Sequence, residues 1–237
     1  LPMTRVRVIG TAVGGGFGGK KPRADLYAAA LAFKARRPVR IVLGREEDLA
    51  VTYKRHPSVI DIQSGVKRDG ALTAWDFRIV LNTGAYADHG PSILSFGAFH
   101  ARGPYKTPHV NIEGRLVYTH RNMSGAFRGY GNPQATFAVE SQMDIIARTL
   151  GIDPVELRRK NGIGPGEFMV NGQWYPEVWF RETLEQAAGA FGWGRPKEAP
   201  SGGRKRGVGI AAGSHPSCGW SSSATVKWMA DGTLQVV

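Results

Sequence analysis

The sequence predicts an α+β fold, because strands and helices mix along the chain without the regular alternation of a parallel nucleotide-binding sheet. Two observations carry this prediction. Alternating apolar residues flank a turn at 68–70 and predict a long antiparallel hairpin, from Val59 to Lys67 and from Ala71 to Tyr86. Apolar residues at helical spacing predict the clearest helix over 133–150, with an apolar stripe of Phe137, Met143, Ile146 and Leu150.

Local patterns predict the other elements in order. Before the hairpin we expect a strand, a helix, a second short strand and a short helix, over 5–9, 22–36, 39–43 and 45–53. Pro22 suits the first turn of its helix, because proline has no N–H to leave unpaired there. After the hairpin we expect a strand over 110–119, helices after Pro154 and over 181–191, and strands from Val208 onward. Asp153 is placed to cap the helix at Pro154 by accepting from its free N–H groups.

Composition narrows the class of protein. The 237 residues carry a net charge of +12, with no apolar run long enough to span a bilayer and no signal-peptide pattern, so we expect a cytoplasmic protein. The basic clusters are scattered and lack interleaved aromatic residues, which makes a nucleic-acid groove a weaker interpretation than an anionic cofactor on a solvated basic surface. A single cysteine, Cys218, excludes an internal disulfide and any iron–sulfur or zinc site that needs several thiolates.

The most informative segment is a glycine-rich run at 13–20. Five glycines surround Phe17, and glycine lets the backbone approach a ligand closely and adopt positive φ. Gly14, Gly16 and Gly19 match the dinucleotide-binding pattern G-x-G-x-x-G. The run also matches a phosphate-binding P-loop, except that Lys21 replaces the Ser or Thr that holds magnesium. A plain tight turn, a nucleotide-binding loop and another kind of cofactor loop all remain open at this point.

A second loop at 124–134 lies between a predicted strand and the clearest helix. Aromatic residues and a charge again alternate with small residues, immediately before a helix start whose unpaired N–H groups can face a ligand. On a simpler interpretation, Phe127 and Tyr130 are core residues beneath a turn and Arg128 lies at the surface.

Together the two loops resemble those of the molybdenum-cofactor subunit of the xanthine dehydrogenase/aldehyde oxidase family. The resemblance rests on Gly14 to Lys20 and on Ala126 to Gln134, and it is collinear from about Arg5 to Asn161. Shorter matching pieces lie at 37–39, 45–48, 82–86 and 153–161. Several motifs in the family's order over this length are more specific than either nucleotide pattern alone.

The resemblance implies a cofactor, a site and a reaction. In this family the main-chain amides of Phe17 and Arg128 would lie against the molybdenum centre, close to its ligands. Gly16 and Gly18 would let the first loop reach the metal, and Tyr130 would pack on the substrate ring. The implied cofactor is molybdenum-molybdopterin, in the cytosine dinucleotide form if the protein is bacterial. The implied reaction hydroxylates an aldehyde or an aromatic N-heterocycle with water as the oxygen source, and electrons leave to iron–sulfur centres and FAD on the partner subunits of a hetero-oligomer.

The resemblance also implies a division of the chain. Residues 1–195 would form a first molybdopterin-binding region, 196–206 a linker rich in Pro, Gly and Lys, and 207–237 the start of a second region. The chain ends on Leu234 to Val237, inside a strand-like run, so we expect a fragment of a longer polypeptide. The family's catalytic glutamate would lie beyond Val237, so we assign no catalytic residue and expect the fragment alone to be inactive.

Two departures from the family argue against xanthine as the substrate. Lys21 stands where purine-oxidising members carry a substrate-binding acid, and Phe96 stands where they carry an arginine. Carbon-monoxide-oxidising relatives carry a cysteine in the second loop, where Gly129 and Tyr130 stand here. Two alternatives to a hydroxylase remain. One is a reductive member of the family that acts on an aromatic acyl-CoA, which the basic surface would suit, and the other is a nucleotide-binding protein that uses the first loop.

Overall fold

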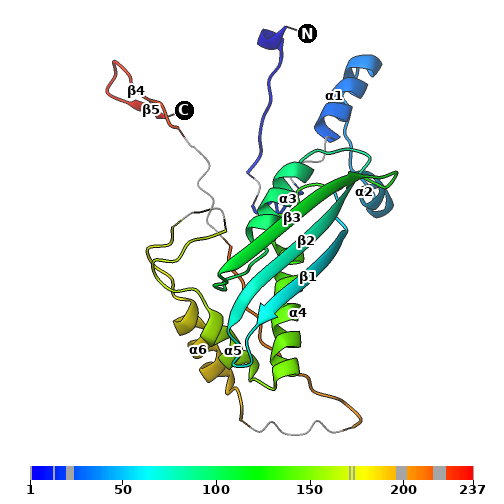
Figure 1. Ribbon diagram of the computed structural model, residues 1–237. Coiled ribbons are helices and arrows are strands. Elements are labelled where there is room, and N and C mark those ends of the chain that lie inside the picture. Colours follow the sequence, from blue (N-terminus) through cyan, green and yellow to red (C-terminus); the bar gives the residue numbers. More distant parts are fainter. Residues whose placement is uncertain are drawn as a thin grey trace.

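The computed structural model describes residues 2–12, 14–19, 24–170, 172, 174–195, 202–215 and 223–236. Figure 1 shows a three-stranded sheet with helices packed behind it and three segments that project from this body. The regular elements are η1 Met3–Arg5, α1 Ala24–Ala35, α2 Arg45–Val51, β1 Ser58–Val66, β2 Leu72–Gly84, α3 Gly90–Phe99, β3 His109–Tyr118, α4 Asn132–Leu150, α5 Pro154–Asn161, α6 Phe180–Phe191, β4 Val226–Trp228 and β5 Leu234–Val236. Predictions that involve Lys20, Lys21, Pro22, Cys218 and most of the linker fall outside the described residues.

The sheet has the strand order β1-β2-β3. β1 and β2 pair antiparallel as the expected hairpin, and the Gly70 N–H closes its turn by donating to the Lys67 carbonyl at 2.9 Å. Gly70 has φ 85°, which glycine adopts without a side-chain clash, so this glycine fixes the turn. β2 and β3 pair in parallel, and the connection between them runs through α3. Because parallel neighbours need such a crossover, the fold contains one βαβ unit that the sequence pattern did not predict.

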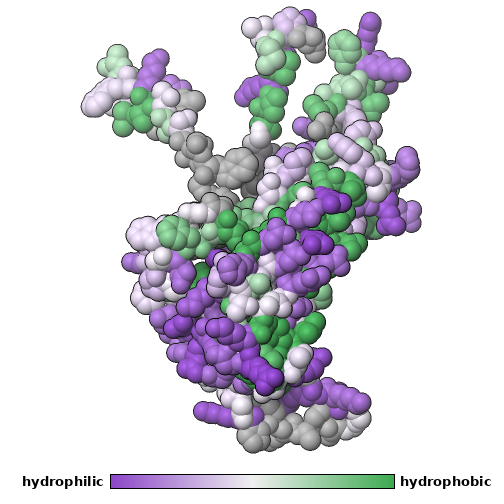
Figure 2. Space-filling view, in the orientation of Figure 1, coloured by the Kyte–Doolittle hydropathy of each residue, from purple (hydrophilic) through white to green (hydrophobic). Residues whose placement is uncertain are grey.

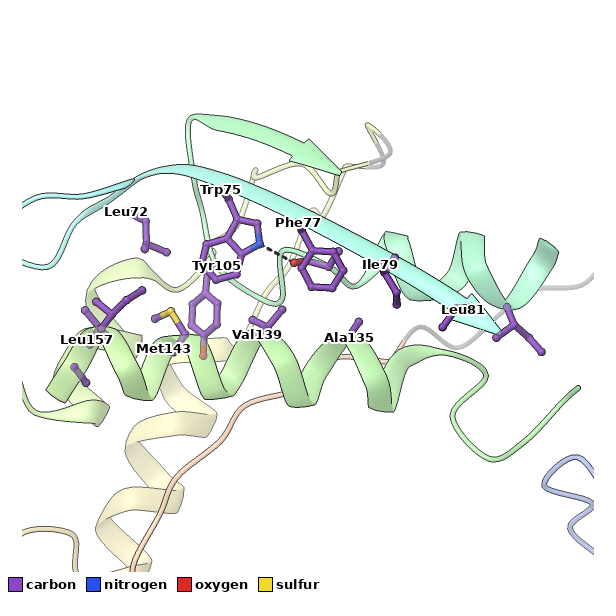
Figure 3. Close-up of a cluster of buried hydrophobic side chains, with 14 residues drawn as sticks. Leu72, Trp75, Phe77, Ile79, Leu81, Tyr105, Ala135, Val139, Met143 and Leu157 are labelled. Carbon is purple, nitrogen blue, oxygen red and sulfur yellow. Dashed lines mark hydrogen bonds between the residues drawn. The ribbon is translucent and has the colours of Figure 1, made fainter. Parts of the chain in front are cut away.

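The core lies between β2 and α4 (Figure 3). Alternate residues of β2 face α4, and residues of α4 that are four positions apart face β2. The residues that meet in this layer are Trp75, Phe77, Ile79, Leu81, Ala135, Val139 and Met143. The Trp75 indole N–H donates to the Ala101 carbonyl at 2.8 Å, so this buried polar atom is paired. The packing fixes α4, and with it the end of the helix where the second glycine-containing loop enters.

Phe137 is not part of this core, and its inclusion in the predicted stripe was wrong. Its side chain is 78% exposed, whereas Met143 and Ile146 are buried as predicted. Val139 precedes Met143 by four residues and shares its face, while Phe137 precedes it by six residues and points about 120° away on a helix of 3.6 residues per turn.

The strands expected over 5–9 and 39–43 are absent from the described residues, and those expected from Val208 onward begin only at β4. Residues 6–12 and 38–43 form no strand, and 3–5 form the short helix η1. A strand needs a neighbour for its N–H and C=O groups, and no described segment pairs with either stretch. The cap of α5 is confirmed, because the Asp153 carboxylate accepts from the N–H groups of Val155 at 2.8 Å and Glu156 at 3.1 Å.

A buried ion pair joins α4 to α5. The fully buried Arg158 guanidinium donates to Glu140 at 2.8 Å and to Asp144 at 2.8 Å. Glu140 also accepts from the Tyr105 hydroxyl at 2.6 Å and from the Ala212 N–H at 2.8 Å. Burial and the neighbouring Glu140 charge raise the pKa of Tyr105, so its hydroxyl keeps the proton that it donates. The network therefore ties the extended segment around Ala212 to α4.

Three segments project from the body: residues 2–12, α1 and the β4–β5 hairpin (Figure 1). Their described side chains are not buried, although Figure 2 shows hydrophobic residues on all three. The core is therefore built by the sheet with α3 to α6. Among the described residues, no helix combines the length and apolar character needed to cross a bilayer.

Candidate functional site

The first glycine-rich loop makes a tight turn around Phe17. The Gly19 N–H donates to the Gly16 carbonyl at 2.6 Å, and Phe17 and Gly18 have φ values of 50° and 101°. A positive φ is uncommon for a non-glycine residue, and the Phe17 side chain is nevertheless 66% exposed. No strand precedes the turn within residues 2–12, so the described residues do not form the strand–turn–helix context of a dinucleotide-binding loop.

The second loop contains three consecutive residues in left-handed conformations. Gly129, Tyr130 and Gly131 have φ values of 90°, 52° and 99°, and α4 begins at the next residue. The Tyr130 N–H donates to the Phe127 carbonyl at 2.8 Å, which closes the turn. Residues held in such conformations persist where the surroundings over-determine them, and they concentrate at functional sites.

The two loops, more than a hundred residues apart in sequence, are in contact. A β-carbon added to Gly18 would overlap the Ala126 carbonyl oxygen and lie 2.9 Å from the Phe127 Cα. The Arg128 guanidinium carbon lies 5.1 Å from the centroid of the Phe17 ring, which is within cation–π distance. The structure thus brings Phe17 and Gly18 of the first loop against residues 126–128 of the second, and at Gly18 the two main chains approach too closely for a side chain.

The N–H groups at this contact suit a ligand with oxygen or sulfur acceptors. In the described part of the chain, the N–H groups of Phe17 and Arg128 donate to no acceptor. Across the described ranges, no group of three or more His, Cys, Asp or Glu side chains is placed to hold a metal ion. The two unpaired main-chain N–H groups would suit the oxygen or sulfur ligands of a metal complex such as molybdopterin.

Tyr130 lies two residues beyond Arg128 and faces aromatic neighbours. Its hydroxyl lies 2.7 Å from Nδ1 of His89, the N-cap of α3. Its ring packs edge-on against the Phe96 ring, with the two ring centroids 5.9 Å apart. Burial raises the pKa of Tyr130, so the hydroxyl stays neutral. Phe96, which the resemblance placed at the position of a substrate-binding arginine, thus lies directly beside Tyr130.

Two more histidines extend this aromatic wall, and sequence reasoning did not single them out. His100 is 3% exposed, and its Nδ1 donates to the Phe96 carbonyl at 2.7 Å. Burial lowers the pKa of His100, which favours the neutral ring. The His215 ring lies 6.0 Å from that of His100 and 5.4 Å from that of Phe96, and the Asn132 side chain holds its segment by donating to the Ser214 carbonyl at 2.7 Å. No local pattern marks these residues, because only the fold brings α3, α4 and residues 214–215 together.

A comparison with models of protein families shows which family this chain belongs to. The family model for the molybdopterin cofactor-binding domain matches residues 1–162, which include both loops and more than half of the chain. The chain belongs to the molybdopterin cofactor-binding family. The resemblance inferred from the two loops is confirmed, and so is the α+β class.

Named relatives and solved structures are similar to this chain over much of its length. The nicotinate dehydrogenase large molybdopterin subunit of Eubacterium barkeri is 40% identical over 189 residues, which cover 79% of this chain and 44% of that protein. The xanthine dehydrogenase molybdenum-binding subunit of Escherichia coli O157:H7 is 38% identical over 247 residues, which cover 100% of this chain and 33% of that protein. The structure of the aldehyde oxidoreductase from Desulfovibrio gigas matches with a TM-score of 0.71 at 33% identity, over 76% of this chain and 20% of that one. The chain spans less than half the length of each of these relatives.

Proposed function

We propose that this molybdopterin-binding chain is part of the large subunit of a molybdenum hydroxylase, which oxidises an aldehyde or an aromatic N-heterocycle with water as the oxygen source. The observation that carries the proposal is the contact of the two loops at Gly18, which places Phe17 beside Arg128. Relatives named nicotinate dehydrogenase, aldehyde oxidoreductase and quinoline 2-oxidoreductase support this substrate range, whereas others are named xanthine dehydrogenase.

In this proposal the main chain binds the cofactor. The N–H groups of Phe17 and Arg128 would donate to it, and Gly16 and Gly18 carry no side chain that would hold it away. When bound, the molybdenum cofactor supplies the two-electron oxidation and the site of oxygen transfer. The chain's own contribution is to hold these donors in place before the substrate arrives, so that little reorganisation is needed during the reaction.

Tyr130 and Phe96 would form the face that receives the substrate. Their rings meet edge to face, and both side chains are half-buried rather than fully buried. Phe96 offers no hydrogen bond to the polar edge of a purine, and Lys21 offers no carboxylate, which disfavours xanthine. An aldehyde or a less polar N-heterocycle suits this pair better.

The rest of the assembly follows from the same proposal. The cofactor would be the cytosine dinucleotide form, and iron–sulfur centres and FAD would lie on partner subunits of a cytoplasmic hetero-oligomer. Two relatives are themselves named as molybdopterin or molybdenum-binding subunits, which supports separate chains. The division into 1–195, a linker at 196–206 and a second region from 207 belongs to this proposal.

Metal and pterin analysis of the full-length protein, expressed with molybdate in a cofactor-producing bacterium, tests the function. We expect about one molybdenum per chain, because one pair of loops makes one site. Oxygen from isotopically labelled water should appear in the product of nicotinate, quinoline or benzaldehyde oxidation. Purified protein without molybdenum would refute the proposal. A rise in melting temperature with ATP or NAD would instead favour the nucleotide alternative.

A further inference from the structure

Arg55 contacts the second loop in three ways. It lies between α2 and β1, where the main chain already adjoins the loop: the Gly125 N–H donates to the Lys54 carbonyl at 3.0 Å. The Arg55 guanidinium donates through Nη2 to the Arg128 carbonyl at 2.6 Å and through Nη1 to Gln134 Oε1 at 3.1 Å. Its central carbon lies 4.7 Å above the Phe127 ring.

These contacts fall on both sides of the left-handed turn. Phe127 and Arg128 precede Gly129, and Gln134 lies in the first turn of α4. The Gln134 amide also donates to the His56 carbonyl at 3.2 Å, so its own side chain is held by the chain beside Arg55. Arg55 therefore links the two ends of the turn. Its contacts are with residues that flank the strained Tyr130, not with Tyr130 itself.

The chemistry of the contacts requires arginine. A planar guanidinium can donate two hydrogen bonds at fixed angles while its face covers an aromatic ring, whereas a lysine ammonium can do only one of these well. Within the described residues no carboxylate pairs with Arg55, so its charge is directed to carbonyl oxygens and the Phe127 ring.

We propose that Arg55 is a positioning residue: by holding the Phe127 ring and the Arg128 carbonyl, it fixes the turn from which the Arg128 N–H would face the cofactor and the Tyr130 ring would face the substrate. The inference rests on the proposed function, since it concerns the same two loops. Arg55 touches neither the cofactor nor the substrate in this scheme. It acts by fixing the residues on both sides of the turn.

The test compares full-length holoenzymes that carry Arg55→Lys, Arg55→Ala or Gln134→Ala with the wild type. The matched control is Arg45→Ala, because the Arg45 side chain is 83% exposed and the one ion pair that it makes with a described residue, Asp48, is 3.8 Å long. Readouts are molybdenum per chain, melting temperature, and the electron paramagnetic resonance spectrum of the dithionite-reduced metal, which needs no substrate. The kcat and KM for nicotinate, quinoline or benzaldehyde are added for whichever of these is turned over.

We expect the Arg55→Lys holoenzyme to retain molybdenum, to show an altered metal spectrum, and to lose about 10- to 100-fold in kcat with a smaller change in KM, as for a misplacement of about 1 Å. Gln134→Ala should change the metal spectrum in the same direction but by less. If the Arg55 variants bind no molybdenum, the spectrum of Gln134→Ala tests the inference in their place. Arg45→Ala should match the wild type.

A loaded Arg55→Lys protein with the wild-type spectrum would overturn the inference. So would variants that lose molybdenum and melting temperature in proportion to activity while their loaded fraction keeps the wild-type spectrum, because Arg55 would then only support the fold. A wild-type protein without molybdenum would instead refute the proposed function itself.

Discussion

Replacing Gly18 by alanine should separate the two loops and reduce cofactor binding. The new β-carbon would lie 2.6 Å from the Ala126 carbonyl carbon and 2.9 Å from the Phe127 Cα, and both are main-chain atoms that cannot rotate away. The φ of 101° adds backbone strain of about 1–3 kcal/mol for a residue with a side chain. If the loops move apart to relieve about 3 kcal/mol of clash and strain, the cofactor must restore that free energy when it draws them together again. Cofactor affinity then falls roughly 100-fold.

The assay is molybdenum per chain in full-length protein produced with limiting molybdate, measured beside the melting temperature. Gly14→Ala is the matched control in the same loop, because a β-carbon there meets nothing within 4 Å and Gly14 is not in the positive-φ region. We expect Gly14→Ala to load like the wild type and Gly18→Ala to load poorly. Equal loading of the two variants would refute the argument that the loop contact forms the site.

Three further predictions concern stability and pH. Glu140→Ala removes the buried carboxylate that pairs with the buried Arg158 and should cost about 3–5 kcal/mol in urea unfolding, while Glu113→Gln at an exposed pair should cost less than about 1 kcal/mol. Similar losses in the two variants would contradict the role of burial. Burial lowers the pKa of His100 below its unfolded value, so its contribution to stability is present above about pH 6.5 and is lost as the pH falls. The melting temperature of His100→Asn should therefore fall less between neutral pH and pH 5 than that of the wild type, and an unchanged slope would count against this assignment. Asp153→Ala removes the α5 cap and should cost about 1 kcal/mol in the same unfolding assay, whereas no change would mean that solvent replaces the cap.

The elements that sequence reasoning predicted correctly are those whose signals are local. The β1–β2 hairpin needs only alternation and a turn at Gly70, and α5 needs only the cap at Asp153. The helix α3 was missed, because a ten-residue segment with Gly90, Pro91 and Gly97 has weak helix propensity and is held by packing against β3 and α4. The expected strand over 5–9 shows the opposite error: its alternating pattern is present, but no described strand pairs with it.

The candidate site was predictable to the extent that it is built from glycines and main-chain groups in two recognisable loops. That these loops touch at Gly18 could not be worked out from spacing, because the contact joins segments that only tertiary packing brings together. The histidines around Tyr130 could not be predicted from a sequence pattern, because His89, His100 and His215 lie far apart in the chain. The positioning role proposed for Arg55 is likewise visible only from its contacts in the folded chain.

The crossover helix α3 has a practical consequence for engineering. His89 stands at its beginning, Phe96 lies on it and His100 at its end, so one short block supplies three of the rings around Tyr130 and its aromatic neighbours. The cofactor loops lie outside this block, before α1 and before α4. If Tyr130 and Phe96 receive the substrate as proposed, exchanging residues 89–100 between related enzymes should change substrate preference. Gly97 of this block packs against Gly131 of the second loop, so the exchange should keep both glycines.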